Sequence, residues 1–445
     1  MNETLLIKNA RMVNEGEIHM GDLLIRNGRI AKIASSISAP AQCVVLEAAG
    51  AHLMPGMIDD QVHFREPGLT HKAGIWSESR AAVAGGITSF MEMPNTLPPT
   101  VTLDALEDKY AIAAEKSLAN YAFYLGATND NLDVIRSLPA GAACGVKIFM
   151  GASTGNMLVD NEETLAGIFR DSPVLIATHC ESTPQIQENL NRAIAKYGRD
   201  IPLSQHHLIR SAEACYQSST TAVALAREFD AQLHVLHLTT AKEMELFAPG
   251  PIEGKSITAE VCVHHLHFCS DDYARLGNQI KCNPAIKTAD DRAALRKALK
   301  DGRLDIIATD HAPHTAEEKA STDYLKAPAG LPLVQDAMLS VLELFHDGVL
   351  SLEEIVTKTA HNVAVRFGVR DRGYLREGYW ADLVIVDTEK FTEVKQENVL
   401  SKCGWSPFEG KNFRSRIVTT LVNGAMSWHD GAIVENHAAG RLEFK

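Results

Sequence analysis

Between residues 55 and 369, compact runs of apolar residues alternate with longer stretches that have the periodicity of amphipathic helices. Repeated strand–helix units of this kind indicate a parallel sheet. This many units favour a closed (β/α)8 TIM barrel over an open sheet. The predicted barrel strands after residue 80 are Thr88–Met93, Tyr121–Leu125, Val146–Met150, Val174–Ala177, Leu233–Leu238, Ile257–Val261 and Ile306–Thr309.

The two ends of the chain have a different pattern. Residues 1–54 contain short alternating segments such as Asp22–Arg26, which is followed by Asn-Gly, a turn signal between strands. Residues 370–445 return to strand-like segments, as at 381–387 and 417–424. We therefore predict β-structure at both ends, outside the barrel.

The charge balance narrows the range of partners. The formal net charge is -13 and the isoelectric point is about 5.8, which argues against a protein that coats nucleic acid or an anionic membrane. We expect no nucleic-acid and no membrane partner, and a small anionic substrate would need a local positive patch.

The N-terminus lacks the features of a secretory signal, and no apolar run is long enough to cross a bilayer, so we expect a cytoplasmic protein. The eight cysteines contain no Cys-x-x-Cys pair, which suits buried thiols in a reducing compartment.

Polar residues lie where the predicted barrel strands end, which is where barrel enzymes carry their chemistry. Imidazole and carboxylate ligands suit zinc, which keeps an open position for water in catalytic sites. Near the first strand, alternation places Asp59, Gln61, His63 and Arg65 on one face, with Asp60 pointing away. That face offers an imidazole for a metal and a guanidinium for a carboxylate. The five candidate metal ligands are His63, Lys147, His179, His237 and Asp310.

Two motifs carry a family resemblance. The run His-Phe-Arg-Glu-Pro-Gly at 63–68 and the run Thr-Asp-His-Ala-Pro-His at 309–314 resemble signatures of the dihydroorotases, within the cyclic amidohydrolase superfamily. In the usual form of the first motif a histidine stands where this chain has Gln61. The resemblance implies a hydrolase barrel at 55–369 and a small β-sandwich formed by 1–54 together with 370–445.

The resemblance also implies an activity, the reversible cyclisation of N-carbamoyl-L-aspartate to L-dihydroorotate in de novo pyrimidine biosynthesis. The metal would activate the attacking hydroxide, and Asp310 would ligate metal and carry the proton. Lys147 would be carboxylated and bridge two metals. Because an amide oxygen is a weaker zinc ligand than imidazole, Gln61 predicts one tightly bound zinc and a weaker second one, which His63, Asp310 and an oxygen of Asp59 or Gln61 would hold. The implied substrate contacts are Arg65, Asn95, Asn283, His314 and the loop 327–332.

Alternative functions stay open at this point. An allantoinase or a hydantoinase would suit the run Gly151–Leu158, although a hydantoinase acting on a substrate without a carboxylate has no use for Arg65. A third alternative is a non-catalytic partner of aspartate carbamoyltransferase, which Gln61 suggests and the otherwise complete ligand set opposes. A homodimer is expected by analogy with the family. We assign supporting or packing roles, and no zinc site of their own, to the histidines in Cys262–Cys269.

Overall fold

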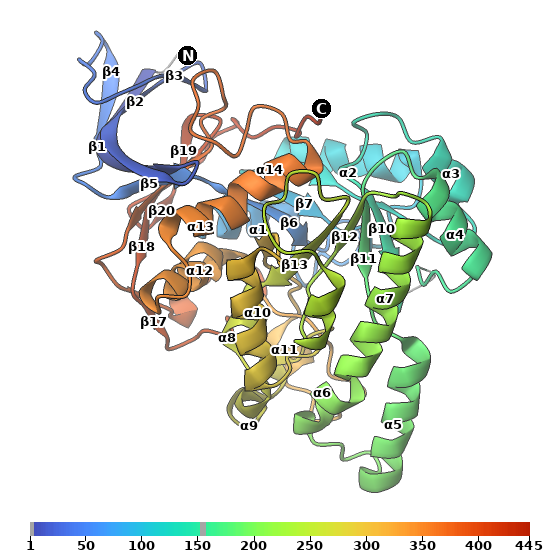
Figure 1. Cartoon of the computed structure of the whole chain (residues 1–445). Coiled ribbons are helices and arrows are strands. Elements are labelled where there is room, and N and C mark those ends of the chain that lie inside the picture. Colours follow the sequence, from blue (N-terminus) through green and yellow to red (C-terminus); the bar gives the residue numbers. More distant parts are fainter. Residues whose placement is uncertain (1–3, 152–156) are drawn as a thin grey trace.

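The computed structural model describes residues 4–151 and 157–445. Parallel strands form a closed barrel in its centre (Figure 1). β8 and β9 are separated only by Tyr124, and the pairing of Val62 with His311 joins the last strand position to the first. The predicted (β/α)8 barrel is therefore confirmed. Its strands are β6 (Met57–Val62), β7 (Ile87–Glu92), β8 (Asn120–Phe123), β9 (Leu125–Gly126), β10 (Val146–Phe149), β11 (Ile176–His179), β12 (Leu233–Val235), β13 (Ile257–Cys262) and β14 (Ile306–Ala308).

Helices surround the barrel, and local capping defines where several of them begin. In α10, for example, Thr288 accepts a hydrogen bond from the Asp291 backbone N–H, and Gly302 in a left-handed conformation ends the helix. The longer helices are α1 (Ile75–Ala84), α2 (Leu103–Lys116), α4 (Glu162–Asp171), α5 (Thr183–Tyr197), α7 (Ala212–Glu228), α10 (Ala289–Asp301) and α12 (Ala337–His346). The shorter ones are α3 (Leu132–Arg136), α6 (His206–Ile209), α8 (Val263–His267), α9 (Tyr273–Leu276), α11 (Ala316–Lys319), α13 (Leu352–Val356) and α14 (Asn362–Phe367).

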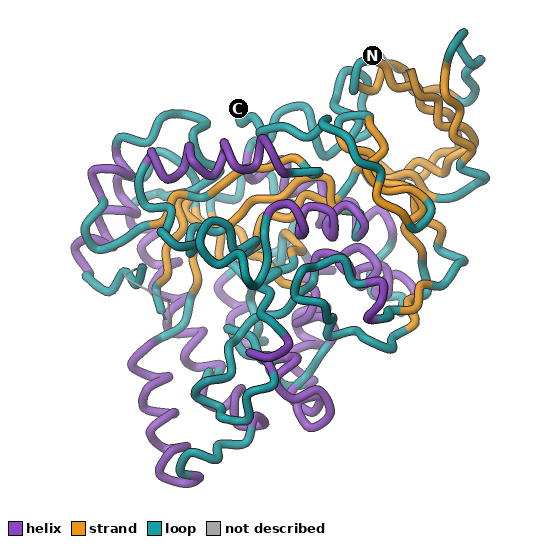
Figure 2. The backbone as a smooth tube through the Cα atoms, turned by 180° about the vertical axis from the view of Figure 1, so that it is seen from behind, coloured by secondary structure: helices purple, strands orange, loops and turns teal. Residues whose placement is uncertain are grey.

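The chain ends combine into one curved, nine-stranded sheet beside the barrel (Figures 1 and 2). β5 pairs with β15 in antiparallel register, Leu53 opposite Ile385, and this pairing joins the two ends. Apolar side chains from both ends, including Ile7 and Leu421, share one buried cluster. The strands are β1 (Thr4–Asn14), β2 (Glu17–Arg26), β3 (Arg29–Ala34), β4 (Cys43–Glu47), β5 (His52–Pro55), β15 (Leu383–Asp387), β18 (Arg416–Val422), β19 (Ala425–His429) and β20 (Ala432–Ile433), with β16 (Thr392–Glu393) and β17 (Asn412–Phe413) in a separate hairpin.

The last residues return to the barrel. Leu442 donates its backbone N–H to Tyr121 O on β8 and is itself buried among barrel residues. The C-terminal segment therefore contacts the barrel as well as the terminal sheet.

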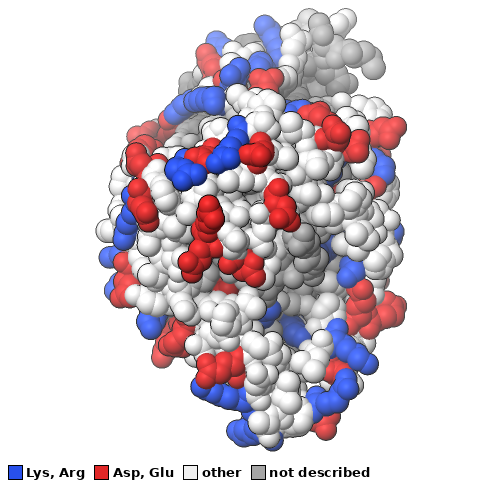
Figure 3. All heavy atoms as spheres, turned by 90° about the vertical axis from the view of Figure 1, so that its right-hand side faces the viewer, with Lys and Arg blue, Asp and Glu red and all other residues white. Residues whose placement is uncertain are grey.

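On the surface shown in Figure 3, acidic and basic side chains are interspersed. Within the described residues, no helix has the length and apolar character needed to span a bilayer.

Candidate active site

The five candidate ligands are buried and come from five different strand positions of the barrel. His63 follows β6, His237 follows β12 and Asp310 follows β14, while Lys147 lies in β10 and His179 ends β11. Asp310 and His237 both have left-handed backbone conformations, with φ of 50° and 42°, and so does Arg65 at 69°. Such conformations cost roughly 1 kcal/mol or more each in a residue with a side chain, and they gather at functional sites.

His63 and Asp310 form the first half of the ligand cluster. His63 Nε2 lies 3.1 Å from Asp310 Oδ1, and its Nδ1 lies 2.8 Å from Asn95 Oδ1. With Asn95 accepting from Nδ1–H, the lone pair of Nε2 faces the carboxylate, an arrangement that suits a cation between the two groups. Burial also keeps the pKa of His63 below its ordinary value, although Asp310 opposes this shift. The neutral imidazole is the form that binds a metal.

Gln61 lies beside this pair, but its orientation differs from the one the sequence suggested. Its Nε2 donates to Asp310 Oδ1 at 3.0 Å, while Oε1 faces Cys262 Sγ at 3.8 Å. The amide therefore presents a hydrogen-bond donor, and not an oxygen ligand, to the cluster. Among the described residues, Gln61 and His63 both contact Oδ1 of the Asp310 carboxylate, and Oδ2 is unengaged.

The expected role of Asp59 as a substitute ligand is wrong. Its carboxylate accepts hydrogen bonds from the Thr309 hydroxyl at 2.6 Å and from the Thr309 backbone N–H at 3.2 Å. Both oxygens are therefore bonded to Thr309 and do not face the ligand cluster. Asp60 instead turns into the barrel interior toward His234. β6 has register irregularities against β7 after residues 57 and 59, and such irregularities redirect side chains from strict alternation.

His179 and His237 form the second half of the cluster. His179 Nδ1 lies 3.0 Å from His237 Nε2, and His179 Nε2 lies 3.0 Å from Glu181 Oε2. Because Glu181 accepts from Nε2–H, the lone pair of His179 Nδ1 is directed at His237. Glu181 is fully buried, and Arg210 in turn pairs with it. Burial alone would raise the pKa of Glu181, but Arg210 and His179 lower it to about 2.

Glu181 was not predicted as a site residue. Its only signal in the sequence is its position two residues after His179 at a strand end.

Lys147 lies between the two halves. Its positive charge helps to lower the pKa values of His63, His179 and His237. The Asp310 carboxylate in turn raises the pKa of Lys147. Within the described residues its ammonium has no hydrogen-bond or ion-pair partner, and it lies 4.8 Å from the centre of the Phe149 ring. Burial lowers its pKa to about 8, against the opposing effect of Asp310 and Glu260.

A cationic pocket adjoins the cluster. Arg65 is buried, donates from Nε to Pro313 O at 3.1 Å, and places Nη2 3.3 Å from His314 Nε2. No carboxylate of the described residues forms an ion pair with it. Lys72, which the sequence did not point to, reaches His314 Nδ1 at 3.0 Å from the other side. Arg65 and Lys72 add to burial in lowering the pKa of His314, which is therefore neutral.

Asn283 and the loop 327–332 complete this pocket. Asn283 Oδ1 is buried and has no hydrogen-bond partner in the described part of the chain, so it is available to a ligand N–H. Ala329 O lies 3.0 Å from His314 Nε2, and a Cβ on Gly330 would come within 2.3 Å of Ala312 O. Only glycine allows this loop to lie so close to the 309–314 segment. Residues 152–156, within the run that suggested a hydantoinase or allantoinase, lie outside the described residues.

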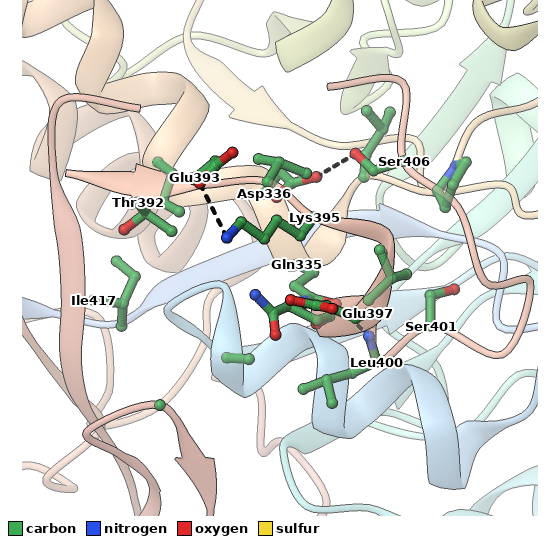
Figure 4. A pocket seen from close by; sticks show the side chains of 18 of the residues that line it. Gln335, Asp336, Thr392, Glu393, Lys395, Glu397, Leu400, Ser401, Ser406 and Ile417 are labelled. Carbon is green, nitrogen blue, oxygen red and sulfur yellow. Dashed lines mark hydrogen bonds and ion pairs between the residues drawn. The ribbon is translucent and has the colours of Figure 1, made fainter. Parts of the chain in front are cut away.

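A cavity of about 530 Å³ occupies a different place, between the barrel and residues 391–401 (Figure 4). Asp336 in its wall accepts a hydrogen bond from Ser406 Oγ at 2.6 Å. None of the five candidate ligands lines it, and neither do Arg65, Asn95, Asn283 and His314, although Pro332, at the end of the loop 327–332, does. This cavity is therefore separate from the five candidate ligands.

Comparison with known proteins agrees with this geometry. A model described as "Amidohydrolase family" matches residues 52–426. The chain belongs to the amidohydrolase family. A dihydroorotase of Methanosarcina acetivorans is 33% identical over 98% of this chain and 94% of the relative, and an allantoinase of Deinococcus radiodurans is 33% identical over 97% and 96%. The solved L-hydantoinase (dihydropyrimidinase) of Arthrobacter aurescens is 29% identical and has a TM-score of 0.92 with both chains fully covered.

This membership confirms the resemblance to dihydroorotases, and the protein is a cyclic amide hydrolase. The residues present fit a metal centre of the kind amidohydrolases use. In one half of the cluster His63 Nε2 faces Asp310, and in the other His179 Nδ1 faces His237. Glu181 orients the His179 imidazole through its other nitrogen. The buried His237 Nδ1 has no hydrogen-bond partner in the described part of the chain. A carboxylate that accepts from one nitrogen of a histidine while the other nitrogen faces a metal is a recurrent arrangement in metal sites.

Proposed function

We propose that the protein is a dihydroorotase that interconverts N-carbamoyl-L-aspartate and L-dihydroorotate in pyrimidine biosynthesis. The observation that carries this proposal is Arg65, a buried guanidinium at the ligand cluster without an acidic partner in the described residues. A buried charge of this kind is stabilised only by an opposite charge or strong hydrogen bonds. Dihydroorotate brings a carboxylate that matches the guanidinium, whereas hydantoin and allantoin bring none.

The metal in this proposal is zinc, held by His63, His179, His237, Asp310 and a carboxylated Lys147. Zinc at this position supplies Lewis-acid polarisation of the ring carbonyl and a nucleophile at neutral pH. We place the tighter site at His179, His237 and Lys147, since Gln61 offers its amide nitrogen to Asp310 and adds no ligand to the other half.

The remaining steps belong to the protein's own side chains. Arg65 holds the substrate carboxylate, and Asn283 Oδ1 accepts a ring N–H. Asp310 Oδ2, which its neighbours leave unengaged, takes the proton of the attacking water and transfers it to the leaving ring nitrogen. Asn95 keeps His63 in the tautomer whose Nε2 faces Asp310, and His314 lines the carboxylate pocket.

Allantoinase is the second candidate. It is favoured by the Deinococcus radiodurans relative, which matches this chain with the same percentage identity as the dihydroorotase of Methanosarcina acetivorans. A non-catalytic partner of aspartate carbamoyltransferase is opposed by the retained ligand cluster, because a scaffold has no use for a buried, unpaired lysine and arginine. The homodimer, the association with aspartate carbamoyltransferase and the cytoplasmic location stay predictions.

The test is a substrate panel on the zinc-loaded protein. We expect ring opening of L-dihydroorotate and ring closure of N-carbamoyl-L-aspartate, with much lower rates on allantoin and hydantoin. Faster turnover of allantoin than of dihydroorotate would replace this proposal with the second candidate. No turnover of any of them by protein with its metal sites filled would favour the scaffold.

A further inference from the structure

A second group of metal-ligating side chains lies inside the barrel. Asp60 from β6, His234 from β12 and Glu260 from β13 converge there, and each is completely inaccessible to solvent. His234 Nε2 lies 3.1 Å from Asp60 Oδ2 and 3.6 Å from Glu260 Oε2. We call these three residues the interior triad.

The interior triad has free coordinating atoms. Both carboxylate oxygens of Asp60, Glu260 Oε2 and His234 Nε2 are buried and lack a hydrogen bond of good geometry to any described residue. On the other side of the ring, His234 Nδ1 lies 2.8 Å from Thr258 Oγ1, which donates its own hydrogen to Leu233 O. Thr258 therefore accepts from Nδ1–H, and this leaves the lone pair of Nε2 directed at the two carboxylates.

The spacing of these atoms matches the edges of a metal coordination polyhedron. Nitrogen and oxygen ligands at about 2.1 Å from a tetrahedral zinc are about 3.4 Å apart, and the two distances from His234 Nε2 bracket this value. We propose that Asp60, His234 and Glu260 bind a divalent cation of the zinc or manganese type, at a site additional to the ligand cluster at the barrel mouth. Two carboxylates and one imidazole match the charge and donor preference of such ions. This inference does not depend on which cyclic amide is the substrate.

A proton is the alternative occupant of the same position. Burial would lower the pKa of His234, but Asp60 and Glu260 raise it to about 9. Without a cation, the imidazole is therefore protonated and pairs with the two carboxylates. With both carboxylates ionised, one proton leaves one negative charge, whereas a divalent cation neutralises both. Burial and Asp60 raise the pKa of Glu260 to about 7, so a second proton competes with the cation for this carboxylate.

The group His264, His265 and Cys282 is a weaker candidate for a cation. Burial raises the pKa of the Cys282 thiol to about 12, so a cation would have to displace its proton. His265 Nε2 is already 3.1 Å from Pro284 O. This contrast is the reason for placing the cation at the interior triad.

A cation there would also support the active site. Glu260 Oε1 accepts the His237 backbone N–H at 2.9 Å, at the residue whose φ is 42°. An ion on Oε2 would hold this carboxylate in place, and Glu260 would act as a positioning residue for His237.

The direct test is anomalous X-ray scattering from crystals of the unmodified protein grown with zinc or manganese. We expect a peak at the absorption edge of the added metal among the side chains of the interior triad. Maps that show metal at the barrel mouth and none at the triad would overturn the proposal and favour the proton.

Metal content gives a second readout. Asp60→Asn keeps the shape of the side chain and removes its charge, so it should bind about one zinc fewer per chain than the unmodified protein. Asp336→Asn is the matched control, because Asp336 is also a buried carboxyl but lies in the cavity wall and belongs to neither ligand group; its zinc content should be unchanged. Equal zinc in all three proteins would contradict the site, and if Asp60→Asn fails to fold the anomalous maps of the unmodified protein decide.

Discussion

Carboxylation of Lys147 is the prediction that the structure makes most quantitative. Carbon dioxide reacts with a free amine and not with an ammonium. At pH 7 a lysine with the ordinary pKa of 10.5 is about 0.03% free amine, whereas a pKa of about 8 gives about 9%. The buried position therefore supplies about 300 times more reactive amine, and in the described part of the chain no hydrogen bond has to break for it to react.

The assay follows from this difference. Metal-free protein is reactivated with zinc at constant dissolved carbon dioxide over a range of pH. The reactivation rate should rise about tenfold per pH unit and level off above about pH 8, because the amine is then already free. A lysine with an ordinary pKa would show no plateau until above about pH 10.

Variants and isotope-labelled bicarbonate identify the modified residue. Lys147→Ala should lose the labelled carbamate signal, most of its zinc and its activity, and small carboxylic acids should restore part of the activity. Lys281 is the internal control: its pKa is also lowered to about 8 by burial, but its ammonium donates to Tyr324 O and Ala327 O. Lys281→Met should keep the signal. Full zinc content and full rate in Lys147→Ala would refute the reasoning.

Three further predictions concern single side chains. Arg65→Met should lower kcat/KM for dihydroorotate about 30-fold to 1,000-fold through loss of a charge-assisted bidentate contact, about 2 to 4 kcal/mol, with zinc content unchanged; unchanged efficiency would remove this role. Gln61→His should gain about one tightly held zinc relative to the unmodified protein after dialysis, since it replaces an amide donor by an imidazole ligand; equal retention in the two proteins would show that a neighbour compensates. Glu181 has a folded-state pKa of about 2, below its ordinary 4.5, so its stabilisation is complete above about pH 4.5 and is lost as the pH falls toward 2. Glu181→Gln should therefore lower the free energy of unfolding at pH 7 by about 3 kcal/mol and flatten its dependence on pH between those values, and a urea titration series in which the two proteins have the same acid dependence would contradict this.

The sequence by itself determined the barrel and the neighbourhood of the site. Short apolar runs separated by helical periodicity can bury both faces of a strand only in a covered parallel sheet, and residues that end such strands gather at one rim. His63, His179 and Asp310 could therefore be assigned to the site from their positions alone. The burial of Lys147 was also readable, because apolar neighbours surround it in the sequence.

The tertiary structure decided which atoms meet. Strict alternation failed at β6, where register irregularities turn Asp59 to Thr309 and Asp60 to His234. At His237 the strand has already ended at Val235, and a left-handed backbone conformation sets the direction of the side chain. Both contacts of Asp310, with Gln61 and with His63, join segments about 250 residues apart. Local periodicity describes a regular strand, but the orientation of a side chain at a strand end is set by the backbone distortion and by the partner that another segment brings to it.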